Sequence, residues 1–211
     1  SFEKIVSFTD FSDFESLVLL AGVGKSFFTL NVLDTERAAL IFLLGASSCG
    51  KGCLKDFILS IIPGKHVFTI DSAAKKGDSF VFYGITEQTL IVVMEEGCDA
   101  SVSMQILKQL ADKGAQIKIR QAITLAKDKE SAVATIRTNC NYIHIANATS
   151  ESMRMMTGDD RRAFMNRLLE FTFVNTPTST DDTIKKSLTD PAKELIPLFI
   201  LSSMAACHVV S

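Results

Sequence analysis

The spacing of apolar residues over the first 33 positions predicts short amphipathic helices. Phenylalanine and aliphatic residues recur at helical intervals from Phe2 to Leu20, and the segment ends near Gly22 and Gly24. From residue 38 the pattern changes to an uninterrupted apolar run. We therefore expect a small N-terminal helical subdomain over residues 1–35.

Short apolar runs of strand length alternate with helical patterns after this point. The run 38–44 is followed by a glycine-bounded polar loop and then by apolar residues at helical spacing from Leu54 to Ile62. The remaining elements are predicted as strands at 66–70, 89–94 and 142–146 and as helices at 104–110 and 161–169. Strands that are apolar throughout and alternate with helices predict an α/β fold with a mostly parallel sheet covered on both faces.

Two segments depart from this alternation. Residues 117–120 alternate apolar and basic side chains, which is typical of one arm of an exposed hairpin. Residues 176–182 are polar and contain a proline, so we expect a linker to the apolar tail Leu195–Val210, which would form a packed terminal helix or a subunit contact. The predicted division is thus a helical subdomain (1–35), a core (36–175), and a linker with a C-terminal helical segment (176–211).

Composition narrows the function classes. A chain of 211 residues with 47% apolar residues can bury a full core, and its net charge of −2 creates no global basic field, so any nucleic-acid contact must come from local clusters of lysine and arginine. The five cysteines are scattered without paired motifs, which argues against a zinc or disulfide framework and favours a reducing compartment. No apolar run reaches the roughly 18 to 20 residues of a membrane span, so no membrane partner is expected.

The polar loop after the first strand carries a phosphate-binding pattern. Its sequence is Gly45-Ala46-Ser47-Ser48-Cys49-Gly50-Lys51-Gly52, which matches the Walker A motif except at its last position. Backbone amides from Gly45 to Cys53 would cradle phosphate, and Lys51 would neutralise its charge. Gly52 replaces the serine or threonine that ligates Mg²⁺, so we expect weak magnesium binding. The alternative is a glycine-rich turn with a solvated lysine.

Two further strands end in polar residues. The run 90–94 ends in Glu95 and Glu96, as a Walker B strand does, with Glu95 assigned to the metal and Glu96 to the general base. The run 142–146 ends in Asn147, whose amide can bind the γ-phosphate or the attacking water. A solvated glutamate pair and a strand-capping asparagine are the alternatives.

An arginine twenty positions after Asn147 completes the set. Arg167 is a candidate arginine finger that would reach the γ-phosphate of a neighbouring subunit. A surface arginine is the alternative, and Arg161 and Arg162 compete for the role.

These motifs, in this order, resemble the superfamily-three helicases of small DNA viruses, most closely the large nonstructural replication protein of parvoviruses. The resemblance covers roughly residues 38–173. The family's Walker B strand ends in two glutamates and a glycine, as at 95–97, and its motif C ends in a hydroxyl residue and asparagine, with Ala146 replacing the hydroxyl residue here. Residues 167–171 look like the arginine-finger segment. Residues 108–121 occupy the place of the family's motif that precedes a DNA-binding hairpin. The resemblance therefore implies that Lys113, Lys118 and Arg120 contact DNA.

The resemblance implies an AAA+-like P-loop NTPase core that binds ATP and Mg²⁺ at subunit interfaces. It also implies a hexameric homo-oligomer that threads single-stranded DNA in the host nucleus. Three alternatives stay open: an assembly module that has lost hydrolysis through Gly52, an RNA helicase of the same superfamily, and a small-molecule kinase that shares the phosphate loop.

Overall fold

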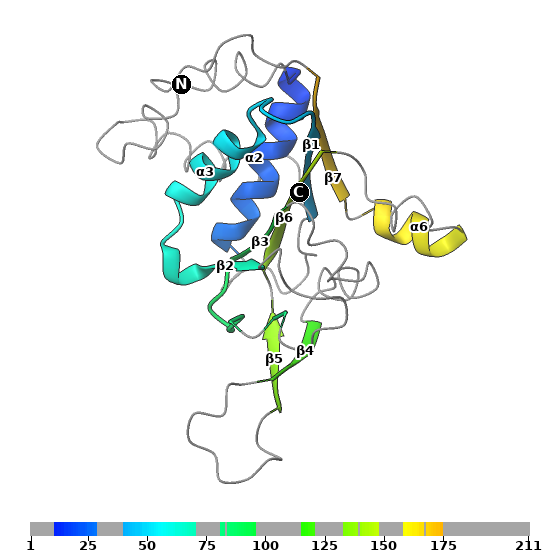
Figure 1. The fold of residues 1–211 in the computed structure, drawn as a ribbon. Coiled ribbons are helices and arrows are strands. Elements are labelled where there is room, and N and C mark those ends of the chain that lie inside the picture. The colour runs from blue at the N-terminus through cyan, green and yellow to red at the C-terminus, as the bar shows by residue number, and fades with distance from the viewer. Residues whose placement is uncertain are drawn as a thin grey trace.

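A five-stranded sheet, in which all neighbouring strands run parallel, forms the centre of the molecule (Figure 1). The computed structural model describes residues 11–28, 40–70, 81–82, 84–95, 115–120, 133–138, 140–147, 158–166 and 168–174. The sheet has the order β2-β3-β6-β1-β7 and consists of β1 (Leu40–Gly45), β2 (Val67–Ile70), β3 (Ile91–Met94), β6 (Asn141–Ala146) and β7 (Leu168–Phe173). The chain therefore has the α/β fold that the apolar runs predicted.

The strand order brings distant parts of the sequence to one edge of the sheet. β1 lies between β6 and β7, with Leu44 opposite Ala146, and β3 pairs with β6, with Met94 opposite His144. The carboxyl ends of β1, β3 and β6 consequently lie next to one another. In open parallel sheets this edge is where ligands bind.

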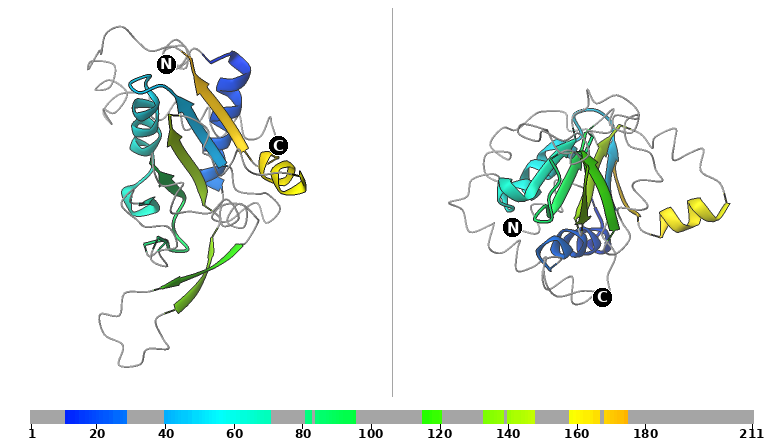
Figure 2. Two further views of the ribbon diagram at one scale, coloured as in Figure 1. Left: turned by 45° about the vertical axis from the view of Figure 1, so that its right-hand side comes forward. Right: turned by 90° about the horizontal axis from the view of Figure 1, so that it is seen from below.

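One face of the sheet is covered by α2 (Asp13–Phe28) and α3 (Lys51–Ser60) (Figure 2). Ile41 and Leu43 of β1 belong to the same buried cluster as residues of both helices, including Leu19, Leu54 and Phe57. Because the helices share this core with the sheet, their packing fixes the position of α3 beside the carboxyl edge.

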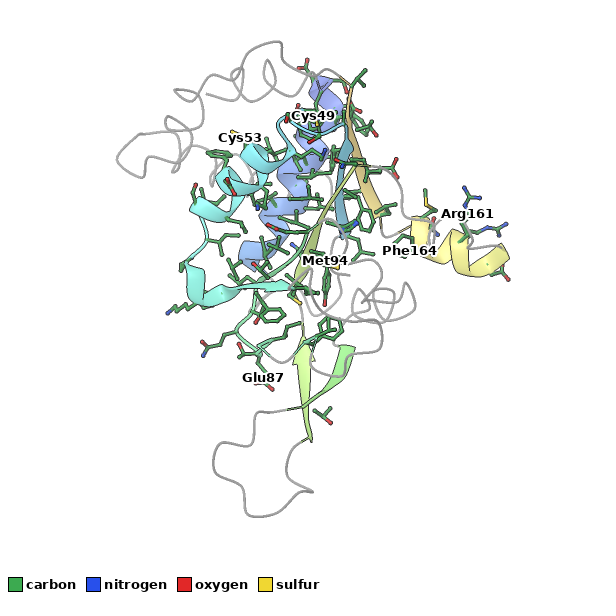
Figure 3. The ribbon with its side chains drawn as sticks, viewed as in Figure 1. Cys49, Cys53, Glu87, Met94, Arg161 and Phe164 are labelled. Carbon is green, nitrogen blue, oxygen red and sulfur yellow. The ribbon has the colours of Figure 1, made fainter. Side chains whose placement is uncertain are left out.

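The opposite face has its own buried cluster. Leu40, Phe42 and Tyr142 pack there against Phe164 of α6 (Gly158–Met165), with the rings of Phe42 and Phe164 6.1 Å apart. Figure 3 shows Phe164 at the end of α6 that is nearest the sheet. Alternate residues of β1 thus face two cores, which explains why the strand is apolar throughout.

The start of α2 is fixed by a reciprocal cap. The Glu15 backbone N–H donates to Ser12 Oγ over 3.2 Å, and the Ser12 backbone N–H donates to the Glu15 carboxylate over 2.8 Å. This capping box satisfies two amides that have no partner within the helix. The helix predicted in the N-terminal segment is therefore present, and it packs directly on the sheet. The division at residue 35 stays a prediction, since residues 29–39 lie outside the described part of the chain, as does the predicted segment 176–211.

A separate two-stranded antiparallel sheet lies between β3 and β6 in the sequence. β4 (Ala115–Arg120) pairs with β5 (Val133–Thr138), as the alternating pattern of 117–120 predicted. Figures 1 and 2 show this pair projecting from the five-stranded sheet on the side away from the start of α3. The short helical turn η1 (Gly64–His66) leads into β2.

The prediction of a helix over 161–169 is wrong in its second half. α6 ends at Met165, and β7 begins at Leu168 and pairs in parallel with β1. In this stretch Phe171 and Phe173 are buried while Glu170 and Thr172 are exposed, which is the two-residue period of a strand. The predicted helix at 104–110 lies outside the described residues. None of the helices within the described ranges is long and apolar enough to cross a membrane.

Candidate functional site

The loop between β1 and α3 has an unusual backbone conformation. Gly45, Ser48 and Gly50 have φ values of 147°, 62° and 101°, in the region that favours glycine. A Cβ on Gly45 would lie 2.7 Å from the carbonyl oxygen of Phe173, so a larger residue does not fit there. Turns that include left-handed residues gather successive N–H groups into a concave anion site. Three residues of the eight-residue loop pattern, two of them glycines, therefore have the left-handed backbone of such turns.

Lys51, the first residue of α3, folds back into this loop. Its side chain is 7% exposed, and its ammonium group donates to the carbonyl oxygens of Gly45 at 2.5 Å and Ala46 at 2.6 Å. It also donates to Oδ1 of Asn147 at 3.2 Å and lies 3.5 Å from the Cys49 sulfur. These hydrogen-bond partners are neutral groups. A buried cation held by neutral oxygens gains by meeting an anion.

Asn147 directly follows β6, and its contact with Lys51 joins residues that are 96 positions apart. The pairing of Leu44 with Ala146 brings the two strand ends together. The structure thus places two of the predicted site residues side by side. The backbone amides of Lys51 and Gly52 come before the first helical hydrogen bond of α3, which runs from the Leu54 N–H to the Gly50 carbonyl, so the helix itself offers them no acceptor.

The carboxylate of Glu95 meets a second lysine. Lys55 Nζ lies 2.8 Å from Glu95 Oε1 and 3.5 Å from Asp56 Oδ1. Burial lowers the pKa of Lys55, but the hydrogen bond and charge of Glu95, together with the charge of Asp56, outweigh burial and raise that pKa above its usual value. Lys55 is therefore a fixed positive charge beside the predicted metal ligand.

Lys55 was not among the residues selected from the sequence. The available signal was its position four residues after Lys51, which places both lysines on one face of α3. Its partner lies 40 positions away, at the end of β3.

The described residues fit the predicted magnesium ion poorly. Mg²⁺ takes oxygen ligands in an octahedral arrangement, but Gly52 offers no hydroxyl and the Glu95 carboxylate is engaged by Lys55. Within the described ranges, no group of three or more histidine, cysteine, aspartate or glutamate side chains could hold a metal ion. The side chains that meet at this edge include two lysines, Lys51 and Lys55.

The other predicted residues are distributed over the rest of the chain. Glu96, Arg167 and Lys113 lie outside the described residues. Arg161 and Arg162 are exposed on α6, and Figure 3 shows Arg161 on this helix, away from the labelled Cys49 and Cys53.

Lys118 and Arg120 lie in β4, where the pairing adds a third basic residue. Lys118 is opposite Thr135, and Gln116 is opposite Arg137. Since residues two apart share a face of a strand, Arg137 is on the same face of the pair as Lys118 and Arg120. The sequence signal for Arg137 was the second strand of the hairpin, which was not identified.

Comparison with known proteins shows the fold alone. Solved apo structures of the C-terminal region of NrS-1 match 98% of this chain at TM-scores of 0.57, 0.55 and 0.53, with 15% to 16% sequence identity. The chain spans about half the length of those chains, 49% to 50%. The sequence matches no family model and no curated protein. The chain therefore shares the α/β fold of the NrS-1 C-terminal region at low sequence identity.

Proposed function

We propose that this chain is the nucleotide-binding motor of a viral replication helicase of the superfamily-three type, which hydrolyses ATP and moves along single-stranded DNA. The observation that carries the proposal is the contact of 3.2 Å between Lys51 Nζ and Asn147 Oδ1 at the carboxyl edge of the sheet. A lysine at the start of the helix after β1 and an asparagine directly after β6 are the residue types that a triphosphate site of this class needs.

The loop chemistry supports phosphate binding. A bound triphosphate would replace the carbonyl oxygens of Gly45 and Ala46 as the acceptor for Lys51, so that the ammonium group would bind an anionic acceptor instead of two neutral ones. The amides of Lys51 and Gly52 would bind phosphate oxygens at the start of α3. Asn147 would then have its amide directed at the γ-phosphate or at the attacking water, with Glu96 proposed as the general base.

A short chain path joins the proposed DNA contact to this site. β5 ends at Thr138, β6 begins at Asn141, and β6 leads directly to Asn147. We assign single-stranded DNA to the basic face of β4 and β5, with Lys118, Arg120 and Arg137. A movement of Asn147 on hydrolysis would thus be passed along one strand to the hairpin.

An arginine finger in this architecture requires a second subunit. Leu168 pairs with Leu40 at the amino end of β1, whereas Phe173 pairs with Gly45 at the other end. Five residue steps separate these ends, about 16 Å at the usual rise of a parallel strand. Arg167 precedes Leu168 in the sequence, so its proposed role is toward the loop of a neighbouring copy in a homo-oligomeric, hexameric ring.

The test measures nucleotide binding and ATP turnover with Mg²⁺, with and without single-stranded DNA. Lys51→Ala should abolish both, and Asn147→Ala should retain binding while turnover falls at least about a hundredfold. Lys65→Ala removes an exposed lysine of η1 and serves as the control. Equal nucleotide binding by the parent and Lys51→Ala would refute the proposal.

A second candidate function is an assembly module that binds nucleotide without hydrolysing it. Two observations favour it, namely Gly52 in the hydroxyl position and the engagement of Glu95 by Lys55. It predicts nucleotide-dependent oligomers, measured by light scattering, in a protein with no turnover. ATP turnover that is stimulated by DNA or by RNA would instead establish the helicase motor and would identify the nucleic acid along which it moves.

A further inference from the structure

Two lysines one helical turn apart on α3 face the same edge of the sheet. Lys51 lies in the phosphate loop, and Lys55 reaches across to the end of β3, where its ammonium group lies 2.8 Å from Glu95 Oε1. The Lys55 side chain is 18% exposed and that of Glu95 is 51% exposed, so water screens the carboxylate more than the ammonium group.

The second lysine lies beside the position where the magnesium-binding hydroxyl is missing. Gly52 and Lys55 are three residues apart, which places them on the same side of the helix. A Cβ at Gly52 would meet nothing within 4 Å, so the glycine leaves open space at the start of α3. The start of α3 thus has no side-chain hydroxyl at position 52 and has an ammonium group three residues later.

We propose that Lys55 is a built-in cation of the nucleotide site, which neutralises Glu95 and lets nucleotide bind with little help from a divalent ion. The proposal rests on the proposed function, since it concerns the same loop. A lone carboxylate at Glu95 would repel an incoming triphosphate, and a divalent ion would have to offset that repulsion. Lys55 offsets it permanently through a contact already present in the folded chain.

The effect is measured as a linkage between metal and nucleotide. For each variant, the dissociation constant of a fluorescent ATP analogue is determined in EDTA and in saturating MgCl₂, and the ratio of the two constants reports how strongly the ion assists binding. Lys55→Met removes the charge and retains a long side chain that suits a helix. Lys65→Met is the matched control on an exposed lysine, and thermal melts check that each variant is folded.

The parent is expected to bind with similar affinity in both conditions, with a ratio below about three. In Lys55→Met the metal-free affinity should fall and be restored by Mg²⁺, so that the ratio rises by about fivefold or more. Lys65→Met should keep the parent's ratio. In a Glu95→Gln background, Lys55→Met should change the ratio little, because no carboxylate is left to neutralise.

Two kinds of failure are distinguishable. An unchanged ratio in Lys55→Met, or a parent that already depends on Mg²⁺ by about a hundredfold, overturns the role of Lys55 while nucleotide binding through Lys51 stands. A parent that binds no nucleotide in either condition, or binding that survives Lys51→Ala, overturns the proposed function and this inference with it.

Discussion

The side-chain amide of Asn141 donates a hydrogen bond of 3.1 Å to the carbonyl oxygen of Gly22, which joins the first residue of β6 to the middle of α2. Asn141 is fully buried, and a Cβ on Gly22 would lie 2.9 Å from a methyl group of Leu169. The glycine thus lets α2 approach the sheet, and the amide fixes its position on the strand that leads to Asn147.

Loss of this anchor should destabilise the fold. Asn141→Ala leaves a cavity at a fully buried position and removes a buried hydrogen bond, so the free energy of unfolding should fall by about 1–3 kcal/mol. Urea denaturation followed by circular dichroism measures the change. Asn166→Ala, at an exposed position after α6, is the control and should leave the midpoint unaltered. Equal midpoints for the two variants would show that the bond contributes nothing.

The sequence predicted β1, β2, β3 and β6 because each is a short, mostly apolar run, a signal that needs no knowledge of neighbours. The capping box at Ser12 and Glu15 was not identified, although its signal is present, since serine and glutamate three residues apart precede an apolar helical run. β7 was misread because Phe164 and Leu168 are spaced as in a helix, and only pairing with β1 resolves the ambiguity.

The sequence predicted which residues belong to the candidate site, but not which of them are in contact. Glu95 and Asn147 were visible at the ends of their strands and Lys51 in the loop after the first strand, but the contact of Lys55 with Glu95 depends on the order of strands in the sheet. Apolar runs do not encode that order, because every central strand presents similar faces to its neighbours. The meeting of Lys51 with Asn147 was implied only through the family resemblance.

Stability should depend on pH through Glu15. The side-chain hydrogen bond from Ser12, followed by that from its backbone amide, lowers the pKa of the Glu15 carboxyl below its usual value. A group whose pKa is lower in the folded state stabilises the fold above its unfolded pKa, about 4.3 for glutamate, and that contribution is lost as the pH falls through the folded pKa.

Ser12→Ala removes the cap and should lower the free energy of unfolding by about 0.5–2 kcal/mol at pH 7. The difference from the parent should narrow as the pH is reduced from 5 toward 3, because the parent then loses the charged carboxylate that accepts these bonds. Urea titrations at several pH values give the comparison, with Glu87→Gln at an exposed turn as control. A difference that stays constant with pH would contradict a role for the carboxylate.

Gly52→Ser should restore part of a magnesium site. The open space around a Cβ at this position accommodates the side chain, and serine is a better helix residue than glycine, so the variant should be more stable by about 0.5 kcal/mol. The added hydroxyl should tighten nucleotide binding in MgCl₂ and leave binding in EDTA unchanged. Gly64→Ser, where a Cβ also meets nothing within 4 Å, controls for the substitution itself. Equal effects of both variants on nucleotide binding would exclude a metal-directed role for position 52.

The basic face of the β4 and β5 pair should bind single-stranded DNA through phosphate contacts. Lys118, Arg120 and Arg137 share this face by strand register, so alanine at any one of them should weaken binding to all sequences alike. Each lost contact should reduce the slope of the logarithm of affinity against the logarithm of salt concentration by about 0.7, the value for a single strand.

Fluorescence anisotropy with a labelled oligonucleotide, over a range of NaCl concentrations, measures this slope. Thr135→Ala changes a neutral residue on the same face, opposite Lys118, and should leave the slope unchanged. Arg137 is the most informative position, because its assignment comes from the pairing of the strands and not from the family resemblance. A parent-like slope in Arg137→Ala, together with a reduced slope in Lys118→Ala, would confine the DNA contact to β4. Parent-like slopes in all three variants would show that the hairpin does not contact DNA.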